Sequence, residues 1–340
     1  MELETFKKEF DVIFLSELDK LLSRTKNRIH NTHINGLLTH TYELAKNGKR
    51  VRPYVMSLAY GATSFEDTAP IHNQLVGIEL LHLFLLVHDD IMDEALTRHG
   101  VASMNSFSEN CYSEVGTKNL QGKYEAILIG DMLFSFAYEL FSKERGIRAL
   151  PLFFELVDEV ITGQMLDIRI PFEDNVTKEM IHERMLFKTA RYSFARPMQI
   201  GAMLSEINSK NESLYFSLGE ELGIIYQITD DIIDIYGSKN DTKKTLLQDL
   251  YNGQETLLSF YIKEHCPQSK QDTLHELSRR TLSEDEIRIA RELFETSGAL
   301  QFAKSEIKAH FDKAESKISL LGENENTWTA LLSRITNRIA

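Results

Sequence analysis

The sequence has few of the residues that interrupt regular secondary structure. Its 340 residues include only 6 prolines and 17 glycines, where average usage predicts ~17 and ~24. Because a fold of many β-strands needs frequent turns, this shortage argues against an all-β protein and favours long helices. The length alone suggests about two domains. However, we find no linker rich in proline, glycine or serine and no fixed-period repeat that would mark a boundary.

Cysteines and long apolar runs are also scarce. Cys111 and Cys266 cannot form a disulfide framework, which favours a reducing compartment. The most apolar stretch, residues 76–87, contains Glu79 and His82 and is too short and too polar to cross a bilayer. The N-terminus is charged and does not read as a secretory signal. We therefore expect a soluble cytoplasmic protein with no stable membrane insertion.

Positive charge is in deficit. The chain has 38 Lys and Arg against 51 Asp and Glu, which gives a net charge of -13. This balance argues against general binding of nucleic acid or of anionic membranes, although it permits a local basic pocket. The 42% of hydrophobic residues lies within the globular range and excludes wholesale disorder.

Apolar residues recur at helical spacing along most of the chain. The pattern predicts two helices within residues 1–46, then helices over 71–93, 126–144, 150–169, 178–206 and 212–236. Residues 48–53, GKRVRP, are predicted to form a basic turn, and residues 237–253 are predicted to be a loop.

Two acidic clusters of the form D-D-x-x-D lie at 88–93 (HDDIMD) and 229–234 (TDDIID). Each follows an apolar helical run, and residues four apart share a helix face. The outer aspartates are Asp89 and Asp93 in the first cluster, and Asp230 and Asp234 in the second. Like charges one turn apart repel, so we expect bound cations. Oxygen ligands without His or Cys partners favour Mg²⁺.

Basic residues that could contact a polyphosphate flank both clusters. They are Lys49, Arg50 and Arg52 of GKRVRP, Arg98 after the first cluster, Lys188 before the second and Lys244 after it. Cationic side chains bind phosphate oxygens directly, whereas carboxylates reach them only through a metal ion. The two kinds of residue together indicate a diphosphate site.

At this point the motifs resemble those of a known family, the trans-isoprenyl diphosphate synthases (polyprenyl synthetases). The matching segments are GKRVRP, LLHLFLLVHDDIMDEALTRHG, GQMLD, KTA and YQITDDIID, followed by Lys244 and Asp249, all in the family's order and spacing over about residues 45–260. Terpene cyclases share a lone D-D-x-x-D, but not the pair. The resemblance implies an all-α fold, with residues 1–340 forming one large antiparallel helical bundle around a central cavity (the isoprenoid synthase fold), and usually a homodimer.

The resemblance also implies a reaction. Three Mg²⁺ ions would hold the diphosphate of an allylic substrate, whose ionisation is followed by 1′-4 condensation with isopentenyl diphosphate. The implied metal ligands are Asp89, Asp93 and Asp230, with Asp90, Asp234 and Asp167 as further candidates. The implied cations beside the leaving diphosphate are Arg98, Lys188 and Lys244. Lys49, Arg52 and His82 match the contacts of isopentenyl diphosphate, and Thr189 and Gln227 match positions along the path of the allylic cation.

Two departures from the family pattern leave alternatives open. His99 stands where a second arginine usually contacts isopentenyl diphosphate, and Glu255 stands before Thr256, where a lysine usually precedes the threonine. These changes leave open the alternative that the protein is a catalytically weak subunit of a prenyl synthase that depends on a partner. A terpene cyclase is a further alternative. The second aspartate cluster, TDDIID, and the segment GKRVRP argue against it.

The residues before the first cluster bear on product length. Phe84 lies about 7.5 Å below Asp89 on a helix, and Leu85 and Leu81 lie four and eight positions before Asp89. In the family an aromatic residue at this place acts as a floor beneath the growing tail. A single aromatic with no insertion in the first cluster resembles the geranylgeranyl (C20) type, with farnesyl (C15) as the alternative.

Overall fold

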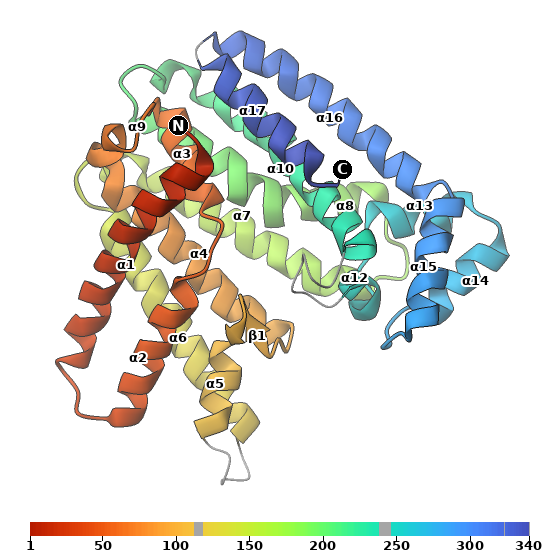
Figure 1. Ribbon diagram of the computed structural model, residues 1–340, viewed down its shortest axis with the longest axis horizontal. Coiled ribbons are helices and arrows are strands. Elements are labelled where there is room, and N and C mark those ends of the chain that lie inside the picture. The colour runs from red at the N-terminus through yellow and green to blue at the C-terminus, as the bar shows by residue number, and fades with distance from the viewer. Residues whose placement is uncertain (112–117, 238–245, 323, 340) are drawn as a thin grey trace. The chain divides into compact units, whose positions relative to one another are not determined.

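The computed structural model describes residues 1–111, 118–237, 246–322 and 324–339, and nearly all of them form helices (Figure 1). Their contacts group into two compact units. Unit 1 comprises Met1–Pro151 and Ile200–Ser209, and unit 2 comprises Leu152–Gln199 and Lys210–Ala340. The expected all-α class is confirmed, whereas a single domain over residues 1–340 stays a prediction.

Unit 1 is built from long helices and one short hairpin. Its elements are α1 (Leu3–Lys26), α2 (Thr32–Ala45), α3 (Val51–Tyr60), the 3₁₀ turn η1 (Glu66–Ile71), α4 (His72–Met92), β1 (Thr97–Arg98), β2 (Val101–Ala102), α5 (Met104–Cys111), α6 (Lys118–Phe141) and η2 (Glu144–Ala149). Strands β1 and β2 pair antiparallel, with Arg98 opposite Val101, and are the only strands among the described residues.

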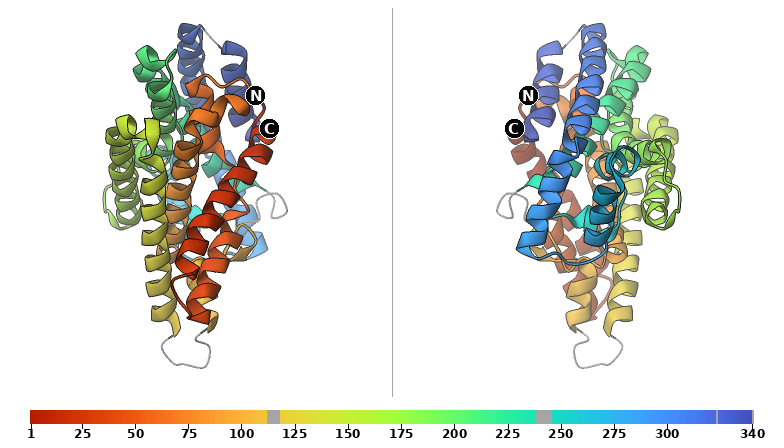
Figure 2. Two further views of the ribbon diagram at one scale, coloured as in Figure 1. Left: turned by 90° about the vertical axis from the view of Figure 1, so that its left-hand side faces the viewer. Right: turned by 90° about the vertical axis from the view of Figure 1, so that its right-hand side faces the viewer.

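The core of unit 1 consists of aromatic and aliphatic side chains between these helices. Phe6, Phe10 and Phe14 recur every fourth residue on α1, are fully buried and stack at 5.4 and 5.8 Å. Helices α4 and α6 run side by side in Figures 1 and 2. They approach so closely that a Cβ on Gly77 would lie 3.0 Å from the carbonyl oxygen of Ala137. A side chain larger than that of glycine would therefore crowd this contact.

A buried arginine fixes the segment GKRVRP. Arg50 has a left-handed backbone (φ 53°) and turns its side chain inward. It donates to Asp11 Oδ1 at 2.6 Å, to Glu79 Oε1 at 2.8 Å and to the carbonyl oxygen of Ala45 at 2.5 Å. A buried charge is tolerated only when it is paired and hydrogen-bonded in this way. The charge of Arg50 is therefore used within the fold.

Unit 2 contains the remaining helices. They are α7 (Leu150–Arg169), η3 (Ile170–Phe172), α8 (Lys178–Arg184), η4 (Met185–Ala195), α9 (Arg196–Leu204), η5 (Ser209–Asn211), α10 (Glu212–Tyr236), α12 (Gln248–Asn252), α13 (Leu257–His265), α14 (Gln268–Leu277), α15 (Glu284–Thr296), α16 (Ala299–Leu321), α17 (Glu325–Thr336) and η6 (Asn337–Ile339). Three of these elements, α7, α9 and η5, have residues in both units, divided as given above.

Helix α10 is central to the packing of unit 2, beside η4, α16 and α17 (Figure 1). Segment η4 has the wide turns of a π-helix: the N–H of Arg196 donates to the carbonyl oxygen of Arg191, five residues earlier. At Gly223 on α10, a Cβ would lie 2.3 Å from the Cα of Ala190. Glycine thus allows the backbones of α10 and η4 to touch, which brings the side chains of both segments within hydrogen-bonding reach.

Most of the predicted helices are confirmed, with differences at their ends. The predicted helix over 212–236 coincides with α10, whereas the helix predicted over 126–144 begins earlier, at Lys118. The predicted basic turn is shorter than expected, because α3 already begins at Val51. Pro53 lies in the first turn of α3, where the missing N–H of proline costs no helical hydrogen bond.

Candidate functional site

The first carboxylate cluster (Asp89, Asp90 and Asp93) ends helix α4 in unit 1. The apolar part of α4 is buried, Asp90 is buried with it, Asp89 is partly exposed and Asp93 is exposed. Arg98 Nε donates to Asp90 Oδ1 at 2.8 Å, Arg98 Nη2 contacts the same oxygen, and Nη2 lies 3.5 Å from Asp89 Oδ2. Burial raises the pKa of Asp90 above its ordinary value, and the charge of Arg98 opposes this rise.

The β1–β2 hairpin presents Arg98 to this cluster. Its two-residue turn is His99-Gly100, with φ of 53° and 86°, the left-handed pair that suits a tight antiparallel hairpin. Because Arg98 ends the first strand, the hairpin sets the position from which its guanidinium reaches Asp90. His99 is exposed at the tip.

Basic groups gather around His82, two turns before the cluster on α4. Burial, and then the positive charges of Arg52 and His99, hold the pKa of His82 well below its ordinary value, and Arg98 adds to this effect. The imidazole of His82 is therefore neutral at pH 7. Arg52, Arg98 and His99, three further predicted substrate contacts, thus act electrostatically on His82. Lys49 is exposed in the turn before α3.

The predicted floor residue packs against α6. Phe84 is buried, and its ring lies 4.7 Å from the ring of His88, edge-on, and 5.4 Å from that of Phe134. Leu81 is fully buried and Leu85 is partly exposed. His88 thus supports Phe84 in a layer of three rings.

The second carboxylate cluster (Asp230, Asp231 and Asp234) ends helix α10 in unit 2. Asp230 contacts Arg338 of η6, whose guanidinium lies 4.2 Å over the ring of Tyr226. Asp234 accepts hydrogen bonds from the backbone N–H groups of Gln248 (3.0 Å) and Asp249 (3.2 Å). These are N–H groups of the first turn of α12, which favours a negative charge.

The middle aspartate of this cluster has an unusual environment. Asp231 is 2% exposed, and Gln227 Nε2 donates to its Oδ1 at 2.7 Å. Its Oδ2 is buried and has no hydrogen-bond partner within the described part of the chain. Burial, and then the negative charge of Asp249, raise the pKa of Asp231 to about 8, against the opposing charge of Arg184.

Asp167, near the end of α7, is a second centre of contacts in unit 2. It pairs with Lys188 and with Arg184 Nη1 (3.1 Å), and Gln254 Nε2 donates to its carbonyl oxygen at 3.0 Å. Burial alone would raise the pKa of Asp167, but the charges of Lys188 and Arg184 outweigh burial and lower it.

Lys188 and Thr189 lie in the π-helical segment η4. At Gly163 of α7 a Cβ would lie 2.3 Å from the backbone nitrogen of Lys188, so η4 passes directly against α7, close to Asp167. Thr189 Oγ1 donates to Gln227 Oε1 at 2.5 Å, and Gln227 in turn donates to Asp231. π-helical turns are frequent at functional sites, and this one aligns a hydroxyl, an amide and a carboxylate.

Sequence reasoning missed several of these residues. Asp231 was not assigned a role, and Arg184 and Arg338 lie outside the motifs. The signal for Asp231 was present, since it follows Asp230 in the motif, whereas nothing local marks the two arginines. Lys244 lies outside the described residues. Glu255 does not leave an uncompensated negative charge, because it pairs with Lys263 and accepts from Ser259 Oγ at 2.7 Å.

The residue types at the two clusters fit a hard divalent cation, since every donor is a carboxylate oxygen. The buried Oδ2 of Asp231 is also an oxygen that a cation could satisfy. Nevertheless, within the described residues no three carboxylate, imidazole or thiol groups converge on one point. Arginine or lysine side chains contact Asp90, Asp167 and Asp230, so these carboxylates are neutralised by the chain itself.

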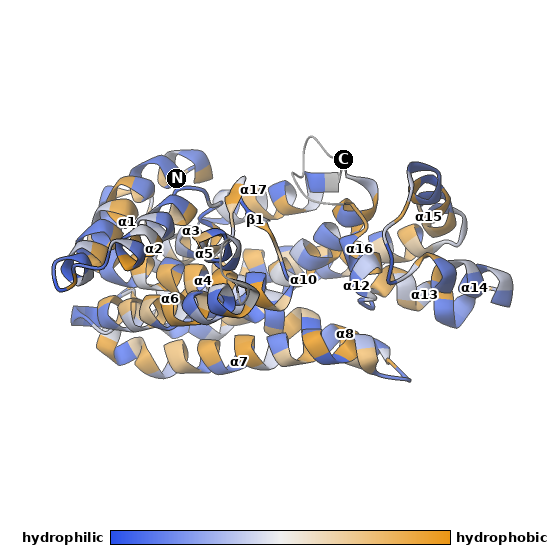
Figure 3. Ribbon diagram, turned by 90° about the horizontal axis from the view of Figure 1, so that it is seen from below, coloured by the Kyte–Doolittle hydropathy of each residue, from blue (hydrophilic) through white to orange (hydrophobic). Residues whose placement is uncertain are grey.

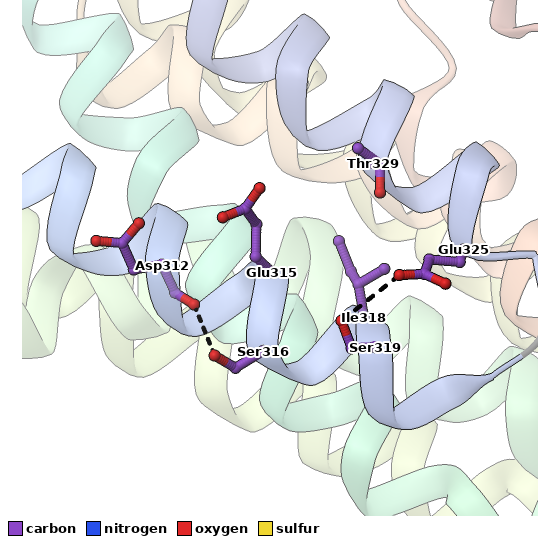
Figure 4. Close-up of a pocket in the computed structure, with 7 residues that line it drawn as sticks. All are labelled: Asp312, Glu315, Ser316, Ile318, Ser319, Glu325 and Thr329. Carbon is purple, nitrogen blue, oxygen red and sulfur yellow. Dashed lines mark hydrogen bonds between the residues drawn. The ribbon is translucent and has the colours of Figure 1, made fainter.

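Two cavities lie elsewhere in unit 2. The larger, about 490 Å³, is lined by Asp312, Glu315, Ser316, Ile318, Ser319, Glu325 and Thr329 on α16 and α17 (Figure 4). The smaller, about 310 Å³, is lined by Lys304, Ile307, Lys308, Phe311 and Thr336. Neither is lined by a residue of the two clusters.

An all-α protein with two aspartate clusters, each ending an apolar helix and each contacted by basic side chains, has the groups needed to bind a diphosphate. Comparison with known proteins agrees. The polyprenyl synthetase family matches residues 34–294, which is most of the chain. The protein therefore belongs to the polyprenyl synthetase family, whose members are prenyltransferases that make prenyl diphosphates.

Relatives with different products are similar to this chain. It is 27% identical over 275 residues to the geranylgeranyl diphosphate synthase of Sulfolobus acidocaldarius, covering 77% of this chain and 78% of that one. It is 24% identical over 280 residues to the octaprenyl diphosphate synthase of Escherichia coli, covering 82% of each.

A solved structure shares the fold. The geranylgeranyl pyrophosphate synthase of Corynebacterium glutamicum, complexed with isoprenyl diphosphate and magnesium, superimposes with a TM-score of 0.85 over 99% of this chain and 100% of that one, at 22% identity. The isoprenoid synthase fold expected from the sequence is thus confirmed. Among the described residues, no helix combines the length and apolar character needed to cross a membrane.

The raised pKa of Asp231 predicts a pH-dependent stability. The folded protein holds a proton on Asp231 that the unfolded chain releases near pH 4, so the free energy of unfolding falls as the pH rises from about 4 towards 8. Asp231→Asn removes the titrating carboxyl, so this fall in the free energy of unfolding should not occur in the variant. In EDTA, which excludes divalent cations, we expect the variant and the parent to melt nearly together near pH 4. At pH 8.5 the variant should melt about 3–6 °C higher.

Thermal unfolding followed by circular dichroism measures this difference. Asp19→Asn, at an exposed position on α1, is the control and should show no pH-dependent gain. An equal melting difference at both pH values would contradict the assignment.

Proposed function

We propose that this protein is a Mg²⁺-dependent prenyl diphosphate synthase that condenses isopentenyl diphosphate with an allylic diphosphate, 1′-4, to give a short-chain product. We propose C20, with C15 as the alternative. One observation carries the proposal: each carboxylate cluster is built into the end of a buried helix and has its own basic side chains, with His82, Arg52, His99 and Arg98 grouped in unit 1. We also propose a cytoplasmic location, supported by two free cysteines.

The carboxylates would bind the metal. In this proposal Asp89, Asp93 and Asp230 hold Mg²⁺, with Asp90, Asp234 and Asp167 as further candidates and three ions at each active site. Bound Mg²⁺ supplies positive charge that stabilises the leaving diphosphate. Arg98 contacts Asp90 and Lys188 contacts Asp167 in the structure. When the diphosphate binds, some of the N–H groups of Arg98 and Lys188 would donate to its oxygens instead.

Other side chains would bind the second substrate and steady the cation. Lys49, Arg52 and His82 would contact isopentenyl diphosphate, and neutral His82 can donate one N–H to a phosphate oxygen. His99 would add a further polar contact. Thr189 and Gln227 carry dipoles that can face positive charge, and their mutual hydrogen bond fixes their orientation. Lys244 is proposed as an additional cation for the leaving group.

An assay of the purified protein with Mg²⁺, isopentenyl diphosphate and dimethylallyl, geranyl or farnesyl diphosphate tests this function. We expect pyrophosphate release that requires both substrates and yields a linear prenyl product. Asp89→Asn and Asp230→Asn should each lower kcat by about 10²-fold or more, because each removes a charged metal ligand. Asp19→Asn, which makes the same change of charge on an exposed part of α1, should leave kcat unchanged.

Three other outcomes would contradict the proposal. Release from the allylic substrate alone would indicate a terpene cyclase. No release unless a second protein is added would indicate a partner-dependent subunit. Equal activity of the Asp89→Asn variant and the parent would remove the first cluster from the mechanism.

If Phe84 limits the space for the growing tail, as its layer with His88 and Phe134 suggests, its removal should change the product length. Phe84→Ala should lengthen the main product by one or more five-carbon units, because it opens space beneath the first cluster. Chromatography of the dephosphorylated products measures the change. Phe311→Ala on α16 is the control. An unchanged product from folded Phe84→Ala would contradict the role of this residue.

We further propose that the protein is a homodimer. Helix α7 and the turn after it expose Phe154, Ile161, Met165, Ile168 and Phe172, whose spacing places them on one helical face. Hydrophobic residues run along α7 in Figure 3. A contiguous apolar stripe of this kind is typical of an association surface, and homodimerisation is what the family resemblance implies.

A charge on this stripe should prevent association. Met165→Glu should lower the mass measured by light scattering from twice 39.1 kDa to 39.1 kDa. The control is Leu320→Glu, which places the same charge at a highly exposed apolar residue on α16. This variant should keep the mass of the parent. A monomeric parent protein would contradict the proposal.

A further inference from the structure

A buried guanidinium lies among the carboxylates of unit 2, contributed by Arg184, the last residue of α8. The residue is 6% exposed. Its Nη1 donates to Asp167 Oδ1 at 3.1 Å, and its Nη2 donates to the carbonyl oxygen of Glu255 at 3.1 Å. A lysine could not span these two acceptors in the same way, because only the planar guanidinium has several donors at fixed angles.

The charge of Arg184 acts on more than its hydrogen-bonded partner. It interacts electrostatically with Asp167, Asp231 and Asp249, which belong to α7, α10 and α12. Asp167 also has Lys188, but Asp231 is bonded to a neutral amide and carries an oxygen that the described residues leave without a hydrogen bond. Arg184 therefore supplies positive charge directly beside the carboxylate of Asp167, and this charge also favours the ionised forms of Asp231 and Asp249.

The hydrogen bond from Arg184 Nη2 to the carbonyl oxygen of Glu255 links two helices of unit 2. Glu255 directly precedes Thr256, the N-cap residue of α13, so Arg184 ties the end of α8 to the start of α13. The carboxylate of Glu255 is directed to Ser259 and Lys263 instead. The Glu255 peptide thus offers Arg184 a neutral acceptor, so Glu255 does not neutralise the charge of Arg184, and this charge remains available to Asp167.

We infer that Arg184 is a positioning residue that fixes Asp167 and, as the resident counter-cation of this carboxylate, weakens the binding of divalent cations to it. The inference rests on the proposed function for its catalytic part, since Asp167 is one of the candidate metal ligands. Its physical part stands on the contacts of Arg184 alone. A resident charge compensates Asp167 without metal, and a metal ion that binds to Asp167 must then bind against that charge.

Binding of Mn²⁺ to substrate-free protein, measured by electron paramagnetic resonance, tests the physical part. Arg184→Met removes the charge, so we expect Mn²⁺ to bind about tenfold more tightly. Arg184→Lys keeps the charge and should bind Mn²⁺ within about threefold of the parent. Arg196→Met is the control, because Arg196 is another arginine of unit 2 paired to a buried carboxylate, that of Glu159 at 2.7 Å. It should leave Mn²⁺ binding unchanged.

Kinetics test the positioning part. Both Arg184 variants lose the planar guanidinium that links Asp167 to the carbonyl oxygen of Glu255. We therefore expect kcat to fall about tenfold to a hundredfold, with little change in KM for isopentenyl diphosphate. In Arg184→Met the Mg²⁺ concentration that gives half-maximal rate should fall at the same time. Loss of a residue that merely stabilises the fold would lower the melting temperature without lowering kcat and the half-maximal Mg²⁺ concentration together.

Each result decides the matter. Unchanged or weaker Mn²⁺ binding by Arg184→Met would overturn the counter-cation role, and full kcat in Arg184→Lys would overturn the positioning role. If Arg184→Met does not fold, Arg184→Lys still tests positioning, and Arg184→Gln replaces methionine for the Mn²⁺ measurement. If the parent shows no condensation but Arg184→Met binds Mn²⁺ more tightly, the proposed function fails while the counter-cation role stands.

Discussion

The structure depends on neutralising carboxylates that end buried helices. An ionised carboxylate loses its hydration when it is buried, and it is stable there only with paired charge or several hydrogen bonds. Asp90 at the end of α4 has Arg98, and Asp167 at the end of α7 has Lys188 and Arg184. The acidic motifs are therefore integrated into the packing, because each of these basic residues comes from a different element.

This constraint separates two kinds of arginine in the chain. Arg50 is surrounded by Asp11, Glu79 and a backbone carbonyl, so its charge stabilises unit 1. Arg98 and Arg338 each contact a partly exposed cluster, where a ligand could replace the carboxylate as their partner. The difference between structural and functional basic residues thus lies in what surrounds them, since their side chains are identical.

The π-helical segment η4 shows how backbone geometry serves the same end. Its wide turns and the nearby Gly163 and Gly223 allow η4 to pass against α7 and α10. Lys188 thereby reaches Asp167, and Thr189 begins the line of hydrogen bonds through Gln227 to Asp231. A regular helix with larger residues at the two glycines could not approach so closely, and the line would be broken.

The sequence by itself determined the all-α class, most helix positions and the two aspartate motifs. These depend on local periodicity and on the scarcity of proline and glycine, and α10 coincides with its predicted range for that reason. The family resemblance of the motifs also named His82, Arg52 and Arg98 as candidate site residues. Local pattern was enough here, because each motif lies on a single element whose faces follow from the helical repeat.

Only the tertiary structure decided which charges meet. Arg184 and Arg338 lie outside every motif, yet they contact Asp167 and Asp230, because long-range packing brings α8 and η6 to those carboxylates. Glu255 stands where the family usually has a lysine, but in the structure Lys263, eight residues further along, pairs with its carboxylate. Electrostatic interactions act between residues that are distant in sequence, and their strength depends on burial. A one-dimensional pattern therefore locates the charged groups but not their partners.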